Sequence, residues 1–162
     1  MKKLFIPLII VAVFIVGVGI FLQKSGILAP TVVKKTESKT VTIAGKTIKV
    51  EVARTEEERS KGLSKRESLN SDSGMLFIFD TEKGNPIFWM KDTKIPLDMI
   101  WIKDGKIIRI DKNVPVPAER TLDSKLKTYS AGVPVDYVLE VSGGYCDTNL
   151  IKVGDSVVTS GV

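Results

Sequence analysis

An uninterrupted apolar run near the start of the chain restricts the possible folds more than any other feature. Residues 4–22 are nineteen consecutive positions without a charged side chain, and Lys2 and Lys3 precede them. As a helix, such a run rises about 28 Å, close to the hydrocarbon thickness of a bilayer, whereas a cleaved signal peptide has only about 7–15 apolar residues. The sequence therefore predicts an uncleaved anchor helix at residues 1–23, which crosses the lipid bilayer through residues 4–22.

The charges and the composition beside this run predict how the rest of the chain is placed. Lys2, Lys3 and the terminal amine favour a cytoplasmic N-terminus, although Lys24 and the lysines after it weaken the asymmetry. Residues 24–40 are rich in Ser, Thr and Lys, which is typical of a flexible tether. We therefore expect a single-pass protein of the cell membrane, in which residues 41–160 form one domain outside the cytoplasm.

The composition excludes several classes of function. Lys2, Lys3 and Lys24 supply three of the five net positive charges, and no basic run alternates with aromatic residues, so we expect no nucleic-acid partner. The chain has no histidine, the usual general base and imidazole ligand, and we predict neither a cofactor nor a metal ion. The single cysteine, Cys146, cannot form an internal disulfide and is expected to be buried as a small hydrophobic side chain.

Beyond the tether, apolar and polar residues alternate with the two-residue period of half-buried strands. A capping box formed by Thr55 and Glu58 predicts a short helix that ends near Gly62. The expected strands are residues 41–43, 47–52, 75–79, 88–91, 97–103, 106–111 and 137–141, with a strand, a turn and a final strand from residue 151 onward. Many short strands predict a mainly β fold, a small β-sandwich or open barrel with one or two short helices, preceded by a single transmembrane helix.

One long connection interrupts this pattern. Residues 112–136 show neither a helical nor a strand period and contain Pro115, Pro117 and Pro134. A connection of this length inside a compact domain is typical of a functional or a disordered segment. Two interpretations stay open, namely a structured crossover between two sheets and a mobile lid.

The densest group of chemically active side chains lies in residues 88–98. In a strand, Trp89 and Lys91 share one face while Phe88 and Met90 share the other. Because a lysine is costly to bury, the face with Lys91 should point away from the core. The sequence therefore predicts that an aromatic platform and a cation lie side by side at the surface.

Two carboxylates are expected to point inward from strands. Asp98 shares a strand face with Ile100 and Ile102. Glu140 shares a strand face with Val138, while its apolar neighbours lie on the other face. A buried carboxylate needs a partner, and we expect Lys91, Arg66 or Arg109 to supply it to Asp98. The alternative to a binding site is a structural salt bridge beneath a tryptophan that packs in the core.

Several short motifs, taken in order and spacing, resemble domain-of-unknown-function family 192. They are Gly62-Leu63 with Arg66, Gly74-Met75-Leu76-Phe77, Phe88-Trp89-Met90-Lys91, Ile95-Pro96-Leu97-Asp98, Tyr137-Val138-Leu139-Glu140-Val141 and Ile151-Lys152-Val153-Gly154-Asp155. The resemblance extends from about residue 41 to residue 158 and implies a compact, mostly β domain, often behind a signal or an anchor. It implies no activity. It places Arg66, Trp89, Lys91, Asp98 and Glu140 at family motif positions, as a shared site or a shared structural core.

Three hypotheses for function follow. The favoured one is a non-catalytic extracytoplasmic module that binds a small polar ligand or an envelope component at Trp89, Lys91, Asp98, Arg66 and Glu140. The second is a scaffold that binds another envelope protein through an exposed apolar patch. The third is a hydrolase or lyase that uses Asp98 and Glu140 as acid and base, and it requires both carboxylates to open onto one cleft.

Overall fold

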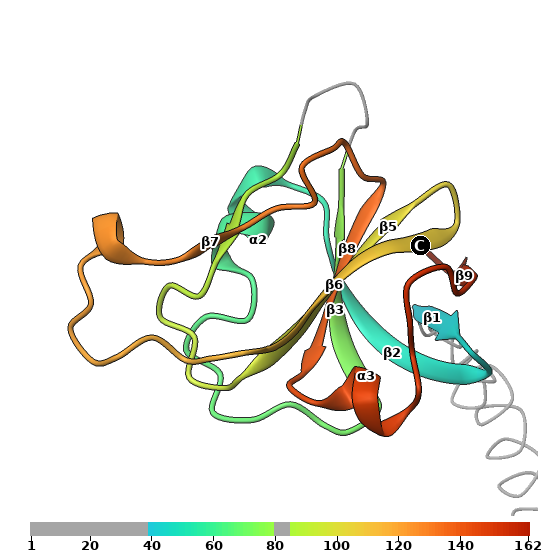
Figure 1. The fold of residues 1–162 in the computed structure, drawn as a ribbon, viewed down its shortest axis with the longest axis horizontal. Coiled ribbons are helices and arrows are strands. Elements are labelled where there is room, and N and C mark those ends of the chain that lie inside the picture. The colour runs from blue at the N-terminus through green and yellow to red at the C-terminus, as the bar shows by residue number, and fades with distance from the viewer. Residues whose placement is uncertain (1–38, 80–84) are drawn as a thin grey trace, which may run out of the picture. The chain divides into compact units, whose positions relative to one another are not determined.

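The fold is known from a computed structural model that describes residues 39–79 and 85–162 (Figure 1). The predicted anchor at residues 4–22 and nearly all of the predicted tether lie outside the described residues. Among the residues that are described, no helix is long and apolar enough to cross a membrane.

The described part of the chain is built mainly of strands. The strands are β1 (Thr40–Ile43), β2 (Lys46–Ala53), β3 (Ser73–Ile78), β4 (Phe88–Trp89), β5 (Leu97–Lys103), β6 (Lys106–Val114), β7 (Thr128–Tyr129), β8 (Tyr137–Ser142) and β9 (Val157–Ser160). The helices are α2 (Glu56–Lys61), the 3-10 turn η2 (Asp123–Lys125) and α3 (Tyr145–Thr148). The predicted mainly β fold with short helices is confirmed, as are the hairpins β1–β2 and β5–β6.

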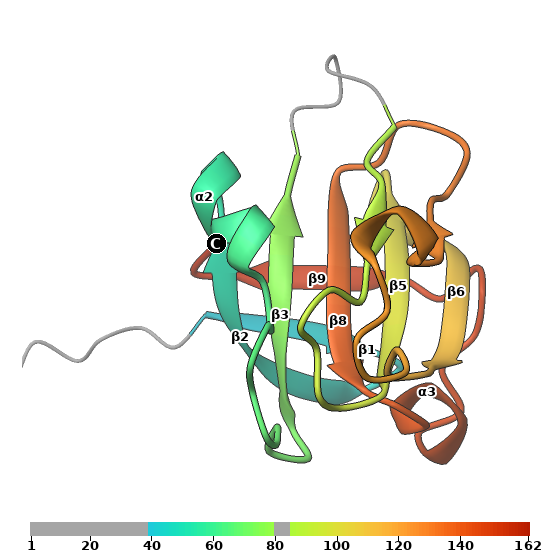
Figure 2. The same cartoon turned by 90° about the vertical axis from the view of Figure 1, so that its left-hand side faces the viewer.

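Seven strands form one curled sheet in the order β6-β5-β8-β3-β2-β1-β9. Neighbours pair antiparallel except β2 and β3, which run parallel with α2 in the connection between them. The edges approach each other where Lys106 bridges Ser156 and the Ile107 amide donates to the Asp155 carbonyl at 3.0 Å. Figure 2 shows β1 and β9 crossing behind β3, β8 and β5. Of the two predicted architectures, the sheet corresponds to an open half-barrel.

The core has two parts, one on each face of this sheet. Inside the curl, Leu76, Ile100 and Leu139 pack with residues of β1, β2 and β9. On the outer face, Phe77 and Trp101 belong to a second cluster, which the β4–β7 pair and the segment after α2 cover. Figure 1 shows α2 and β7 on one side of β3 and β8, and β1 and β9 on the other. Burial on both faces explains why β3 is apolar after Ser73, as predicted for a central strand.

Two predicted strands differ from those observed. The strand expected at residues 88–91 is only the two-residue β4, which pairs with β7 outside the main sheet, and the chain turns at Asp92 with a φ of 53°. The strand expected just after residue 151 is wrong. There the Ile151 amide bonds to the Cys146 carbonyl at 2.9 Å, and Gly154 takes a φ of 93°, so the chain turns until β9 begins. At both places a positive φ turns the chain away from the extended path of a strand.

Residues 112–136 begin with the end of β6 and continue as a connection to β8 across the outer face. Within this connection, β7 pairs with β4, and Tyr129 and Val135 are buried in the outer cluster. Of the two interpretations of this segment, these contacts favour the structured crossover. The crossover brings η2 next to the segment that follows β4, where the candidate site lies.

Candidate functional site

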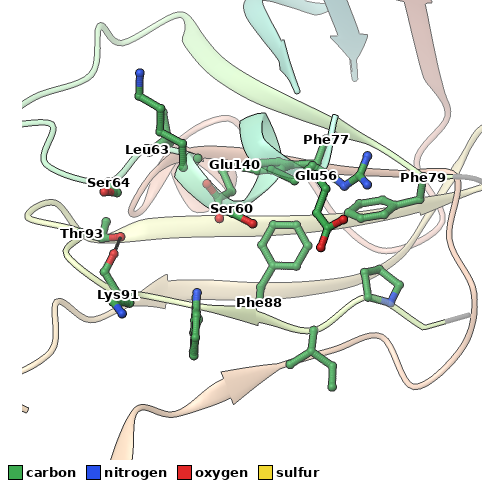
Figure 3. Close-up of a pocket in the computed structure, with 16 residues that line it drawn as sticks. Glu56, Ser60, Leu63, Ser64, Phe77, Phe79, Phe88, Lys91, Thr93 and Glu140 are labelled. Carbon is green, nitrogen blue, oxygen red and sulfur yellow. Dashed lines mark hydrogen bonds between the residues drawn. The ribbon is translucent and has the colours of Figure 1, made fainter. Parts of the chain in front are cut away.

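A pocket of about 320 Å³ opens on the outer face of the sheet, where α2 and the segment after it face β4 (Figure 3). Its floor is formed by β3 and β8, and its walls come from α2 and from residues 86–93. The lining residues are Glu56, Arg59, Ser60, Lys61, Gly62, Leu63, Ser64, Phe77, Phe79, Pro86, Ile87, Phe88, Trp89, Lys91, Thr93 and Glu140. The volume lies near the lower end of the range of about 300–1,000 Å³ that is typical of small-molecule sites.

Helix α2 forms one wall of the pocket, and local interactions fix both of its ends. At the N-terminus, the predicted capping box is confirmed: the Glu58 amide donates to the Thr55 hydroxyl at 3.2 Å, and the Thr55 amide donates to the Glu58 carboxylate at 3.0 Å. The hydrogen bonds that the Glu58 carboxylate accepts from the backbone amides of Thr55 and Arg54 lower the pKa of Glu58. At the C-terminus, the chain turns at Gly62 with a φ of 46°.

Arg59 ties this helix to the sheet. Its guanidinium donates to the Arg54 carbonyl and, at 3.2 Å, to the Ile78 carbonyl at the end of β3. The same group lies 5.3 Å from the centre of the Phe79 ring, within the range of a cation–π contact. One of the two terminal nitrogens of Arg59, Nη1, is thus already engaged by the protein.

Aromatic rings form the inner wall. Phe88 of β4 stands edge-to-face against Phe77 at 4.9 Å, Phe79 at 6.0 Å and Trp101 at 5.4 Å between ring centroids. Edge-to-face contacts of this kind hold rings in fixed orientations. Phe88 therefore links the short β4 to the main sheet and fixes the position of Trp89 beside it.

Glu140 supplies the carboxyl group at the floor of the pocket. In the register of β8 it lies opposite Met75 of β3 and Met99 of β5, so its side chain emerges on the outer face. It is 5% exposed and lines the pocket, where Figure 3 shows its carboxyl near Ser60 and Phe88. Burial raises the pKa of Glu140 from 4.5 to about 8. At neutral pH this carboxyl is therefore mostly protonated, and it can both donate and accept a hydrogen bond.

Trp89 and Lys91 lie at the rim, on the outward face that the alternation predicted. Trp89 is 47% exposed while Met90 is 3% exposed, so the predicted orientation of this segment is confirmed. The Lys91 ammonium lies 5.7 Å from the Trp89 ring and pairs with Asp123 of η2. The hydrogen bond that Lys91 donates to the Asp123 carboxylate raises the pKa of Lys91. The ion pair attaches the 112–136 crossover to the edge of the pocket.

Asp98 is buried, as predicted, but its partners are not the predicted cations. The carboxylate accepts backbone N–H groups from Asn113 at 2.6 Å, Gly144 at 3.0 Å and Cys146 at 2.8 Å. Asp98 pairs in register with Val141, the neighbour of Glu140, so the two carboxylates project from opposite faces of the sheet. Asp98 is 0% exposed. The acid–base pair of the hydrolase hypothesis therefore does not share a cleft, and Asp98 is a structural residue that fastens α3 to β5 and β6.

The remaining predicted cations are paired elsewhere. Arg66 donates two hydrogen bonds to Glu51 of β2, at 2.7 and 2.6 Å, and does not line the pocket. Arg109 pairs with Asp111 at 2.6 Å, and Asp111 also accepts the indole N–H of Trp101. Of the five predicted site residues, the structure brings together Trp89, Lys91 and Glu140.

Sequence reasoning missed the aromatic wall and the hydroxyl groups. Phe88 belongs to a family motif, but nothing in the sequence predicts that it and Phe79 form the wall of a pocket, and no motif includes Ser60 or Ser64. The capping box places Ser60 on the last turn of a short helix, but no pattern shows which strand that helix faces. Within residues 39–79 and 85–162, no three His, Cys, Asp or Glu side chains gather in a way that could hold a metal ion.

Comparisons with known proteins identify the family. A crystal structure of a protein of unknown function from Novosphingobium aromaticivorans is 32% identical, with a TM-score of 0.65 over 74% of this chain and 83% of that one. A candidate transcription regulator from Sinorhizobium meliloti is also 32% identical, with a TM-score of 0.65 over 77% and 96% of the two chains. No curated protein matches the sequence. Residues 39–159 match the family described as uncharacterized ACR, so the chain belongs to domain-of-unknown-function family 192, as its motifs predicted.

Proposed function

We propose that residues 39–162 are a non-catalytic module that binds a small polar ligand in the pocket above Glu140. One observation carries the proposal: a buried carboxyl group faces a cavity of about 320 Å³ that aromatic rings surround. Burying a carboxyl group in a core costs free energy, whereas a bound ligand can form hydrogen bonds with it. The binding hypothesis requires Trp89, Lys91 and Glu140 to line one cavity, and all three line this one.

The test is a ligand screen on the full-length protein. Trp89 is exposed and Trp101 is buried, so acrylamide quenches mainly Trp89, and a ligand in the pocket should protect it. A library of sugars, cell-wall fragments, amino acids and nucleotides should give at least one compound that reduces quenching and raises the melting temperature. Replacing Lys91 with Met should weaken the binding of that compound. The control Lys94→Met, which removes an ion-paired lysine outside this pocket, should leave the binding unchanged. If no compound protects Trp89, the binding proposal is wrong.

We further propose that residues 4–22 tether this module to the cell membrane and that the module lies outside the cytoplasm. The support is the length of the apolar run and the lysines before it. Carbonate extraction of membranes should leave the full-length protein in the pellet, and protease added to spheroplasts should digest residues 39–162. Release into the supernatant would contradict the anchor, and protection from protease would contradict the orientation.

A further inference from the structure

The charges around the pocket limit the kind of ligand that suits it. Arg59, Lys61 and Lys91 line its walls, and the acids among the lining residues are Glu56 and Glu140. With Glu140 mostly protonated at neutral pH, the cations outnumber the charged acids. A cationic ligand would therefore be repelled at the rim and would also have to displace the proton of Glu140.

An anionic ligand is also poorly served. Lys91 is paired with Asp123, and Nη1 of Arg59 donates to two backbone carbonyls. A negatively charged group would have to compete with these interactions or bind Lys61 and the other N–H groups of Arg59. At the floor it would meet the aromatic rings and Glu140, and ionisation of that carboxyl would repel it.

Neutral hydrogen-bonding groups, in contrast, lie on two walls and at the floor of the pocket. Ser60 and Ser64 line one wall, and the Thr93 hydroxyl donates to the Lys91 carbonyl at 3.3 Å on the other, as Figure 3 shows. A hydroxyl can donate and accept, as can the protonated Glu140. Trp89 adds a half-exposed aromatic surface of the kind on which the C–H groups of a sugar ring pack.

We propose that the pocket binds a neutral, hydroxyl-rich ring of the sugar class, which hydrogen-bonds to the Glu140 carboxyl group at the floor and packs against Trp89 at the rim. This inference rests on the proposed function and specifies its ligand. The cavity volume suits a single ring rather than a long polymer. A protonated carboxyl can serve one ligand hydroxyl as donor and acceptor at once, which a carboxylate cannot.

Binding of the sugar should depend on pH. Because the ligand binds the protonated form and burial raises the pKa of Glu140 to about 8, affinity should be constant at lower pH and about tenfold weaker at pH 9 than at pH 7. The other charged groups that line the pocket are Glu56, Arg59 and Lys61 of α2 and Lys91 after β4. None is a histidine or a thiol, the side chains that ordinarily titrate in this interval.

The experiment uses full-length protein in a detergent without a sugar headgroup. The probes share one ring and differ in charge: glucose and N-acetylglucosamine are neutral, glucosamine is cationic and glucuronate is anionic, with galactose and mannose as further neutral probes. Binding is measured by protection of Trp89 from acrylamide and by calorimetry at about pH 6.5, where the amine of glucosamine is charged. The affinity of the best neutral sugar is then followed to about pH 9.

Variants at one position separate the possible outcomes. Glu140→Gln keeps a neutral donor and acceptor, so it should bind the neutral sugar within about threefold of the parent, with no dependence on pH. Glu140→Leu removes both groups and should weaken binding at least about tenfold. Glu57→Gln, on the exposed side of α2 and outside the pocket, should retain the affinity and the pH profile of the parent protein.

The results distinguish this inference from the proposed function beneath it. Binding of a neutral sugar that weakens above pH 8 and is retained by Glu140→Gln supports the inference. Binding of glucosamine or glucuronate in preference to every neutral sugar, or loss of binding in Glu140→Gln, overturns the sugar inference and leaves a ligand pocket. Failure of all the sugars overturns the inference alone if another compound of the screen protects Trp89. If none does, the proposed function is overturned as well.

Discussion

Replacing Glu140 with Gln should change how the stability of the domain depends on pH. In the folded protein burial raises the pKa of Glu140 from 4.5 to about 8, whereas the unfolded chain should ionise near the ordinary value. Between these values the folded state holds a proton that the unfolded state has lost. The stabilising contribution is fully present below pH 4.5 and is lost as the pH rises to about 8. Glutamine has nearly the same shape and does not titrate.

The magnitude follows from the size of the shift. Each pH unit in this interval lowers the free energy of unfolding by about 1.4 kcal/mol, so ionisation of Glu140 should cost about 5 kcal/mol in all. Other groups titrate equally in the parent and in Glu140→Gln, so their contributions cancel in the difference between the two proteins. The variant should gain stability relative to the parent steadily from about pH 5 to pH 8 and remain constant above that.

The assay is urea unfolding of residues 39–162, which contain both hydrophobic clusters, at a series of pH values. Burial of Trp101 makes its fluorescence a reporter of unfolding. Glu57→Gln, an exposed substitution, serves as the matched control and should run parallel to the parent. Parallel curves for Glu140→Gln and the parent would show that Glu140 ionises normally. The neutral floor of the pocket would then be refuted.

Three further predictions concern structural residues. Asp98→Asn weakens three backbone hydrogen bonds to a buried carboxylate and should cost about 3 kcal/mol in urea unfolding, while the exposed Asp147→Asn should leave stability nearly unchanged. Gly74→Ala would place a methyl group 2.6 Å from a backbone oxygen of β8 and should cost about 3 kcal/mol in the same assay. Burial and the nearby carboxylate of Asp98 raise the pKa of Cys146, so a thiol reagent should modify it only when denaturant unfolds the domain.

Some of the site could be predicted because strand alternation is local. Placing Lys91 outward places Trp89 outward as well, and the apolar neighbours of Glu140 require that strand to be buried on both faces. These inferences needed only the order of residues along one strand. The same rule predicted that Asp98 points inward, and the structure confirms it.

What failed depends on contacts between distant segments. The partners of Asp98 are backbone amides at chain reversals. Because nearly every residue has a backbone N–H, the sequence does not indicate which of them will bind a given carboxylate. Whether Asp98 and Glu140 share a face depends on the register of β5 against β8, and a shift by one residue would reverse the answer. The expected strand after Ile151 was wrong because an apolar, alternating segment can also turn, as it does here at Gly154.

The pocket itself could not be located from the sequence for the same reason. Its walls come from α2, β4 and the segments beside them, and its floor from β3 and β8. Phe88 joins these parts through ring contacts with Phe77 of β3 and with Phe79, just after that strand, both about ten residues away along the chain. A capping box predicts that a helix exists but not which surface it covers.

The most direct test of a ligand pocket above Glu140 is carbon-13 NMR of the side-chain carboxyl groups of the full-length protein during a titration with the best compound of the screen. The carboxyl resonance of Glu140 and the indole resonance of Trp89 should move together and saturate at one concentration. The carboxyl resonance of Asp98, on the opposite face of the sheet, should stay in place. If Glu140 and Trp89 stay unchanged while the compound binds elsewhere, or if Asp98 moves with them, the pocket is not the binding site.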